Sequence, residues 1–327
     1  MLKSSNSFSM PPLKKGDRIK GGQYEIIDNT VNEGGFGRIY RAYGSRRNND
    51  NTRHVVAIKE FFINELQGVN GRSVSLGDYS RAYNEEEVEA WREKFFYETR
   101  VLAKLNEQRD RHVPWVHAWS GDKIVFEDNG RLFYAMTFIE GMTLREAVEK
   151  CGVMDEGKAI DYAIQIAKVL YKAHKWGFTH CDVSPNNIML QDGFAVLVDF
   201  GNARSYDIEW VQQNEPRAYA GTSGFTPPYS AYVGSEQGDI YSLAATLFYL
   251  LTGVAPHLMV TECSRRKNVA LLQNKNVSDS TIRAIMNALD TESENCITSA
   301  KDFLLQLPNE MVVNSLLNYN DINFDKL

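Results

Sequence analysis

Two neighbouring stretches hold the densest set of polar residues in the sequence: HCDVSPNNIM at residues 180–189 and VLVDFG at residues 196–201. The first supplies Asp182 and Asn187, and the second supplies Asp199 after a short apolar run that predicts a buried strand. Two carboxylates and an amide oxygen suit a hard cation that bridges phosphates, because Mg²⁺ prefers a few oxygen ligands together with water and substrate phosphate. Taken singly, each of these residues would be an ordinary Asx turn. Their grouping predicts a metal and phosphate site.

A glycine-rich stretch lies far upstream, NEGGFG at residues 32–37, between two strand-like runs. Glycines there would let backbone N–H groups approach phosphate oxygens without interference from a Cβ atom. An ordinary hairpin turn would have the same composition. The stretch alone therefore leaves both interpretations open.

One lysine and one glutamate are predicted to meet. Lys59 follows the apolar run 56–58, and Glu98 falls at the middle step of an apolar stripe with helical spacing. The other members of that stripe are Trp91, Phe95, Leu102 and Leu105, in a helix that Asn84 and Glu87 would cap. An inward carboxylate needs a partner, because an unpaired buried charge is costly, and Lys59 is the natural candidate. The alternative is that Lys59 is a solvated strand end and Glu98 reaches water at the edge of the stripe.

Composition places the chain among globular proteins and excludes several classes. Its 327 residues are 43% apolar and 24% charged, and the net charge of −6 argues against a nucleic-acid-binding surface. The four cysteines show no C-x-x-C spacing, which favours a reducing compartment over a disulfide framework or a zinc site. Residues 1–20 lack the apolar core of a signal peptide. The most apolar window, 242–260, is interrupted, so its continuous part is too short to span a bilayer and indicates a buried helix. We therefore expect a soluble, cytoplasmic protein without a membrane segment.

The secondary-structure pattern changes from strands to helices near residues 138–141. Strand-like runs occupy 24–27, 38–42, 55–59, 123–126 and 132–136, and a short buried strand is expected at 196–198. Helical periodicity occupies 155–175, 239–252, 278–290 and 298–307. Strands followed by helices favour an α+β fold, or two lobes with a cleft between them.

The order of these features resembles a protein kinase. A glycine-rich loop, a strand lysine, an inward helix glutamate, H-x-D-x-x-x-x-N and D-F-G follow one another over about residues 20–307. The sequence most resembles bacterial members of the eukaryotic-like Ser/Thr kinases. The segments that suggest this are KGGQYEI at 20–26, AIKEFF at 57–62 and DIYSLAATL at 239–247.

The resemblance implies a bilobal fold with an ATP cleft between the lobes. It divides the chain into a leader at 1–20, a small β-rich N-lobe at 21–137, a larger helical C-lobe at 138–307 and a tail at 308–327. The N-lobe would carry an insertion at 64–83, which is either a surface loop or a regulatory surface for a partner.

The resemblance also implies roles in transferring phosphate from ATP to a Ser or Thr hydroxyl of a protein substrate. Asp182 would accept or orient the hydroxyl, Lys59 would hold the α- and β-phosphates while paired with Glu98, and Thr222 would lie near Asp182. Asn187 and Asp199 would hold Mg²⁺ or Mn²⁺, and Asp239 would cap the catalytic loop from a buried helix. The nucleotide would contact a further set of residues, Val31, Gly34, Gly35, Phe36, Gly37, Ile39, Ala57, Met136, Thr137, Ile139 and Met189.

The chain departs from the family pattern in several places. Asn32 replaces the first loop glycine, Cys181 replaces the arginine before the catalytic aspartate, and Ser184 replaces a lysine, which predicts a slower enzyme. Tyr229 and Cys296 stand where the family has an ion pair, so both partners would be lost together. An active Ser/Thr kinase is the leading hypothesis. A pseudokinase scaffold and a small-molecule kinase are the alternatives, and the segment 221–229 disfavours the second because such a segment docks a protein substrate.

Overall fold

The computed structural model describes residues 11–29, 32–34, 37–45, 53–62, 85–107, 110–118, 123–205, 221–228 and 234–308. These residues belong to two compact units. The N-terminal unit contains the described chain up to Asp110 together with Pro114–Ile139, and the C-terminal unit contains Arg111–Val113 and the described chain from Glu140 onward. The predicted insertion at 64–83, the predicted helix cap Asn84, the side chain of its partner Glu87, and the tail from residue 309 lie outside the described part of the chain.

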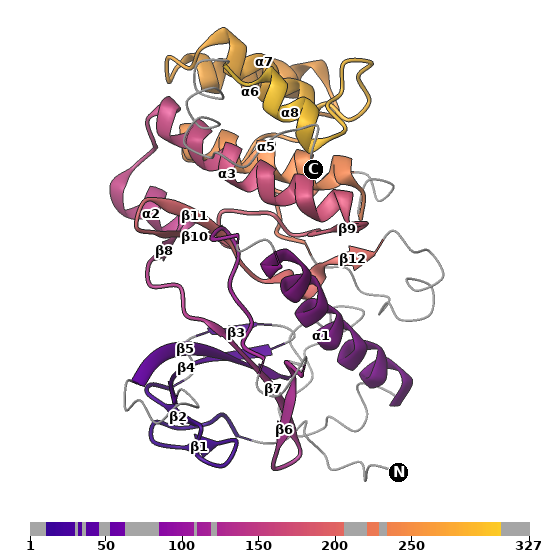
Figure 1. Cartoon of the computed structure of the whole chain (residues 1–327). Helices are drawn as coiled ribbons and strands as arrows, with labels where there is room; N and C mark the ends of the chain where they lie inside the picture. Colours follow the sequence, from indigo (N-terminus) through magenta and orange to yellow (C-terminus); the bar gives the residue numbers. More distant parts are fainter. Residues whose placement is uncertain are drawn as a thin grey trace. The chain divides into compact units, whose positions relative to one another are not determined.

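The N-terminal unit is built on one antiparallel sheet of seven strands, in the order β1-β2-β4-β5-β7-β6 with β3 paired to β4 (Figure 1). The strands are β1 (Arg18–Ile19), β2 (Tyr24–Ile26), β3 (Asn32–Gly34), β4 (Gly37–Ser45), β5 (Arg53–Phe61), β6 (Phe126–Asp128) and β7 (Arg131–Thr137). Four of the predicted runs fall on β2, β4, β5 and β7. The predicted strand 123–126 is wrong except at its last residue, because the tight turn at Asn129 and Gly130, both with positive φ, sets the β6–β7 pairing at Phe126–Asp128.

The predicted loose leader does not reach residue 20. Arg18 and Ile19 pair with β2 as β1, and Ile19 is buried. The backbone of Gly16 donates to Ile26, and Ile26 donates back to Asp17. The end of the leader is therefore part of the sheet, because its alternation of exposed Arg18 and buried Ile19 fits a strand.

One long helix, α1 (Glu85–Asn106), completes the N-terminal unit. The predicted apolar stripe is confirmed, since Trp91, Phe95, Leu102 and Leu105 are all buried. The Phe95 ring packs against aromatic rings of β5 and β7, with centroid separations of 5.5 Å to Phe61 and 5.2 Å to Tyr134. These contacts fix one face of α1 against the sheet.

The C-terminal unit is mainly helical and also contains two small sheets, β11-β10-β8 and β12-β9. Its elements are β8 (Met142–Thr143), α2 (Leu144–Cys151), α3 (Glu156–Lys175), β9 (Phe178–Thr179), β10 (Ile188–Gln191), β11 (Phe194–Leu197), η4 (Phe200–Asn202), β12 (Arg204–Ser205), α5 (Glu236–Thr252), α6 (Glu262–Gln273), α7 (Asp279–Leu289) and α8 (Ala300–Gln306). The four predicted helices correspond to α3, α5, α7 and α8. The predicted strand at 196–198 is β11, displaced toward the N-terminus.

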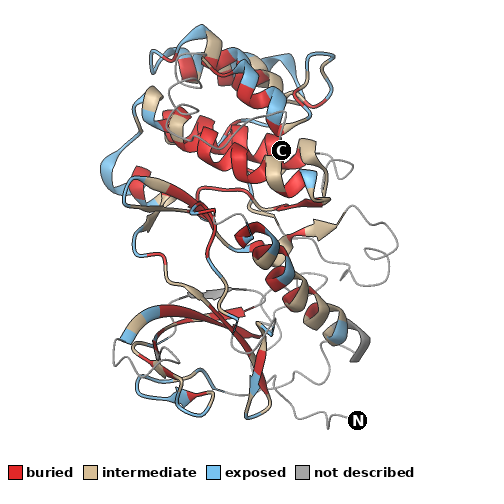
Figure 2. Cartoon of the chain, viewed as in Figure 1, coloured by how far each residue is buried: buried red, intermediate tan, exposed pale blue. Residues whose placement is uncertain are grey.

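Helices α3 and α5 pack side by side and form the core of this unit (Figure 1), and both are buried along most of their length (Figure 2). Nearly every residue of α5 is buried, from Gly238 to Thr252. Ser235 caps its N-terminus, and Gly253, with φ of 80°, ends it. The buried helix predicted over the apolar window 242–260 is therefore confirmed as far as Thr252. Beyond Gly253 the prediction is wrong, because the chain leaves the helix there and Val254, Leu258 and Val260 are exposed. Within the described residues, no helix combines the length and apolar character needed to cross a bilayer.

Candidate active site

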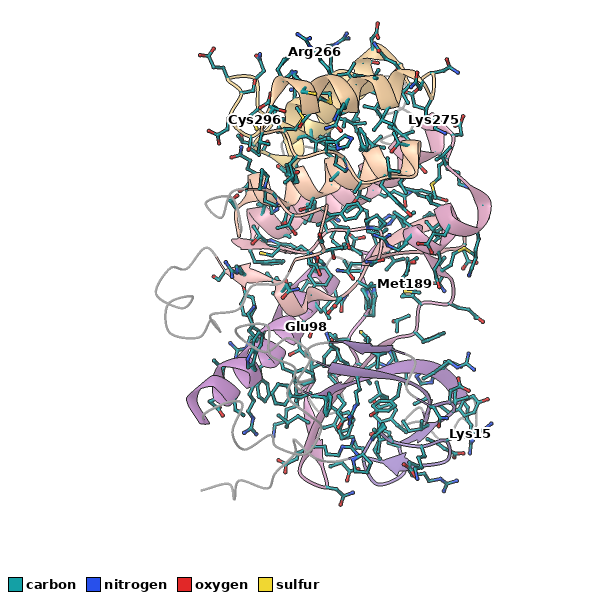
Figure 3. All side chains as sticks on the ribbon, turned by 180° about the vertical axis from the view of Figure 1, so that it is seen from behind. Lys15, Glu98, Met189, Arg266, Lys275 and Cys296 are labelled. Carbon is teal, nitrogen blue, oxygen red and sulfur yellow. The ribbon has the colours of Figure 1, made fainter. Side chains whose placement is uncertain are left out.

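In the N-terminal unit, Lys59 of β5 and Glu98 of α1 form a buried ion pair. Lys59 Nζ donates to Glu98 Oε1 at 2.7 Å and to Oε2 at 2.9 Å. Lys59 is 5% exposed and Glu98, labelled in Figure 3, is 2% exposed. The pairing expected from the helix stripe is present, and each charge compensates the other away from water. The roles of these residues in catalysis stay a prediction.

The glycine-rich stretch forms a hairpin in which β3 pairs with β4. Asn32 lies opposite Ile39, and Gly34 lies opposite Gly37. A Cβ atom on Gly37 would lie 3.0 Å from the Lys59 side chain and 3.1 Å from the backbone oxygen of Glu60. Glycine at this position therefore lets β4 lie close to the lysine. Val31, Gly35 and Phe36 lie outside the described residues.

The predicted adenine-binding residues of this unit lie on adjacent strands. Ala57 of β5 is directly opposite Met136 of β7, and Ile39 of β4 is opposite Lys59. Met136 is half-buried, and Ile139 is buried after the strand ends. The N–H of Thr137 donates to the carbonyl of Trp115 at 2.8 Å. Of the Thr137 backbone groups, the carbonyl is thus the one that could accept a hydrogen bond from a nucleotide.

In the C-terminal unit, hydrogen bonds converge on the carboxylate of Asp182. Thr222 donates to Oδ1 from its backbone N–H at 2.9 Å and from its hydroxyl at 2.8 Å. Asn187 Nδ2 donates to Oδ2 at 2.9 Å and to the Asp182 backbone carbonyl at 2.8 Å. Burial raises the pKa of Asp182, and the nearby Asp199 adds to this, while the bonds from Thr222 and the neighbouring His180 oppose it.

The two predicted metal ligands flank the β10–β11 hairpin, Asn187 just before β10 and Asp199 shortly after β11. Asp199 directly follows Val198, whose N–H donates to the backbone carbonyl of Asn187 at 2.9 Å. Because the Asn187 amide nitrogen is committed to Asp182, its side-chain oxygen is the group left to bind a cation. A carboxylate and an amide oxygen fit Mg²⁺, which keeps several waters and phosphate oxygens. The described residues contain no group of three or more His, Cys, Asp or Glu side chains that could hold a metal by themselves.

A buried aspartate on α5 holds the loop that carries Asp182. Asp239 accepts from the backbone N–H groups of His180 and Cys181, both at 2.8 Å, and contacts His174 Nε2 at 2.9 Å. The prediction that Asp239 caps this loop from a buried helix is confirmed. The loop needs such an anchor because Cys181 has a φ of 66°, a backbone conformation that residues other than glycine rarely adopt.

Comparison with known proteins adds the family. The family description "Protein kinase domain" matches residues 79–312, more than half of the chain. This chain belongs to the protein kinase family. The matched range includes Glu98, Asp182, Asn187 and Asp199 and begins after Lys59.

Two bacterial serine/threonine-protein kinases are among the curated relatives of this family member. It is 27% identical over 295 residues to the serine/threonine-protein kinase PknA of Nostoc, covering 88% of this chain and 47% of the relative. It is 30% identical over 240 residues to the serine/threonine-protein kinase PknD of Mycobacterium tuberculosis, covering 72% of this chain and 30% of the relative. The chain thus spans less than half the length of these relatives.

A solved structure of another kinase-family protein shares the fold. The crystal structure of Rad53 1–466 in complex with AMP-PNP matches with a TM-score of 0.57 at 19% identity, covering 86% of this chain and 64% of that one. With this likeness and the strand-rich and helical units, the α+β kinase fold class is confirmed.

Sequence reasoning missed two polar residues of the kinase site. Asn202 Nδ2 lies 3.4 Å from Asp182 Oδ2, and His174 of α3 contacts Asp239. Asn202 lies three residues after the D-F-G aspartate Asp199, a local cue that could have found it. Nothing local links His174 to a residue 65 positions later. Met189, labelled in Figure 3, is half-buried on β10 opposite Thr143 and Val196.

The departures from the kinase pattern are structurally accommodated. Ser184 is fully buried, and its hydroxyl oxygen lies 3.2 Å from the hydroxyl oxygen of Thr222. Cys181 is buried with its sulfur 3.1 Å from the Thr179 hydroxyl. Cys296 meets Gln237 Nε2 at 3.1 Å. Tyr229, the other half of the replaced ion pair, lies outside the described residues.

Proposed function

We propose that this chain is an ATP-dependent protein serine/threonine kinase that transfers the γ-phosphate of ATP to hydroxyl groups of a protein substrate. The observation that carries the proposal is the Asp182 carboxylate, which Thr222 and Asn187 hold from two sides. A carboxylate fixed in this way can orient a substrate hydroxyl and accept its proton as the new oxygen–phosphorus bond forms and the bond to ADP breaks.

The charged residues around this step have complementary tasks. Lys59, kept in place by Glu98, would hold the α- and β-phosphates, and Asn187 and Asp199 would hold Mg²⁺. A bound Mg²⁺ would neutralise charge on the phosphate oxygens. The nucleotide would lie against Ala57, Met136 and Met189, together with Gly34–Gly37, Val31, Ile39, Thr137 and Ile139.

Two features support protein hydroxyls as the acceptor. The segment 221–228 contributes Thr222 directly to Asp182, so the residues that would receive a peptide are tied to the reacting carboxylate. Curated relatives similar to this chain are named serine/threonine-protein kinases, which supports a Ser or Thr hydroxyl as the acceptor. A cytoplasmic location, expected from the cysteine pattern, is part of this proposal. A regulatory partner at 64–83 stays a prediction.

A pseudokinase scaffold is the second candidate. Ser184 favours it, because this fully buried hydroxyl cannot bring the positive charge that a lysine would place near the γ-phosphate.

Phosphoryl transfer from labelled ATP tests both candidates. Purified protein is incubated with the label, Mg²⁺ or Mn²⁺ and a mixture of acceptor proteins, followed by phosphoamino-acid analysis, with Asp182→Asn as the control. We expect phosphoserine and phosphothreonine from wild type and none from the control. Equal background labelling by both proteins would favour the scaffold, and mainly phosphotyrosine would overturn the Ser/Thr assignment.

A further inference from the structure

Next to Lys59 on β5 lies a second buried charge that the proposed chemistry does not use. Glu60 is 1% exposed. Tyr40 donates its hydroxyl to Glu60 Oε2 at 2.6 Å, and Arg131 Nε donates to Oε1 at 2.6 Å. Arg38 lies farther away, 4.0 Å from Oε2. Since an isolated buried carboxylate is costly, these partners are needed to keep Glu60 in this position.

The Glu60 cluster and the Lys59–Glu98 pair lie on opposite faces of the sheet, because consecutive strand residues point to opposite sides. The pairing register agrees with this. Ile58 is opposite Tyr40, and Glu60 is opposite Phe133, so Tyr40, Glu60 and Arg131 share one face. That face also carries a buried apolar cluster that includes Tyr40, Ile58 and Phe133.

The chain before β1 completes both contacts of Glu60. Arg131 Nη2 donates to the carbonyl of Pro11 at 3.0 Å, and the N–H of Leu13 donates to the Tyr40 hydroxyl at 3.3 Å. Leu13 also packs against the apolar cluster of this face. Each of the two residues that hold Glu60 is therefore itself held by the backbone of residues 11–13.

We propose that Glu60 is a positioning residue for Lys59, and that residues 11–13 complete its anchor through Tyr40 and Arg131. Glu60 fixes the backbone of β5 one residue from Lys59, about 3.8 Å away along the chain. Misplacement by about 1 Å can cost a large factor in the efficiency of a phosphate-binding group. The proposal rests on the proposed function, because it takes Lys59 as the phosphate-binding lysine.

The test measures affinity for a fluorescent ribose-labelled ATP analogue with Mg²⁺, using the full chain and its variants. Tyr40→Phe removes the hydroxyl that links Glu60 to Leu13 and keeps the ring. Deletion of residues 2–13 removes the segment itself. We expect each change to weaken nucleotide affinity about fivefold or more. That is the factor for one typical hydrogen bond, and Tyr40→Phe removes the bonds to Glu60 and from Leu13, while the deletion removes those at Pro11 and Leu13. Two matched controls, deletion of residues 2–9 and Glu25→Gln on β2, should leave affinity unchanged.

A double-mutant cycle separates positioning from a general loss of stability. In a Lys59→Met background Tyr40→Phe should have no further effect on affinity, because its influence passes through Lys59. Circular dichroism and thermal unfolding confirm that each compared variant is folded. If Glu60→Gln, which removes the charge, does not fold, Tyr40→Phe still carries the test.

The outcomes distinguish this proposal from the proposed function. Wild-type affinity in folded Tyr40→Phe, or an effect of equal size with and without Lys59, would overturn the positioning role. Unchanged affinity in Lys59→Met would instead refute Lys59 as the phosphate-binding residue. A wild-type chain that binds no nucleotide would refute the proposed function and the positioning role together.

Discussion

Lys59 donates to both carboxylate oxygens of Glu98, and the two side chains are 7% and 3% exposed in the ion pair. A two-pronged contact between β5 and α1 ties the lysine to one position of the helix. Any displacement of α1 would change where the ammonium group lies. The pair is therefore both a structural contact and a control point for the proposed phosphate site.

Removing one charge of this pair should lower the free energy of unfolding more than removing both charges. Glu98→Gln leaves a buried ammonium without its counter-charge, and we expect a loss of about 3–5 kcal/mol in the free energy of unfolding. The double variant Lys59→Met/Glu98→Met replaces both charges with apolar groups of similar size, so it should recover most of that loss. Urea unfolding of the single and double variants measures the difference. A double variant as unstable as Glu98→Gln would show that the two charges do not compensate each other. Glu98→Gln and the double variant should both lack phosphoryl-transfer activity.

Loss of the carboxylate at position 199 should abolish transfer with little change in stability. Asp199→Asn keeps the size of the side chain and its bond from Gly201, but removes the negative charge that would hold Mg²⁺. We expect turnover to fall about 100-fold or more, with the unfolding curve unchanged. A steady-state assay over a range of Mg²⁺ concentrations checks this. Near wild-type turnover would contradict the assignment, and Asp192→Asn, in the turn between β10 and β11, is the control.

Replacing Thr222 should shift the acid limb of the pH–activity profile. Burial raises the pKa of Asp182 above its ordinary value of 3.8, and the hydrogen bonds from Thr222 hold that rise in check. Transfer needs ionised Asp182, so Thr222→Val should move the acid limb of kcat/KM to higher pH.

The effect of Asp182 on the pH dependence of folding stability is opposite in sign to that of a salt-bridged aspartate. Because the folded state binds the proton more tightly, stability falls as pH rises from 3.8 through the raised pKa and is constant above it.

Activity measured from acid to neutral pH for wild type, Thr222→Val and Ser223→Ala tests this shift. Ser223 is exposed and adjacent, so its variant should keep the wild-type profile. An unchanged acid limb in Thr222→Val would show that this hydroxyl does not control ionisation of Asp182.

Apolar spacing predicted the elements that bury a continuous face. The stripe through Trp91 and Leu105 and the mainly apolar α5 were both evident, because their apolar residues recur along the chain. Helix α6 escaped prediction because only Asn268 and Leu272 are buried along it, so it shows no apolar stripe. Helix α2 is short, but its capping box of Thr143 and Glu146 is visible in the sequence and could have located its start.

The contact between Glu98 and Lys59 was predictable because an inward-facing charge needs an opposite charge as its partner. Glu98 on an inward face required a cation, and Lys59 was the cation available. The contacts of Glu60 were not predictable in this way, because they join Tyr40, Arg131 and the backbone of Pro11 and Leu13, which are far apart in sequence. Their meeting depends on strand order, which periodicity does not fix.

Full activity should not require phosphorylation of the segment around residues 205–223. Kinases switched by such a phosphate use the arginine beside the catalytic aspartate to bind it, and a phosphate of about −1.5 to −2 charge orders a loop by gathering arginines. Cys181 supplies no charge, and its buried sulfur contacts Thr179. Protein fully dephosphorylated by a phosphatase that is then removed should phosphorylate an exogenous substrate without delay. The test follows the initial rate with and without pre-incubation with ATP, with Ser205→Ala and Ser223→Ala as comparisons. A lag that pre-incubation abolishes and phosphatase restores would show that a phosphate does switch the enzyme on, and that another cation, such as Arg204, takes the place of the missing arginine.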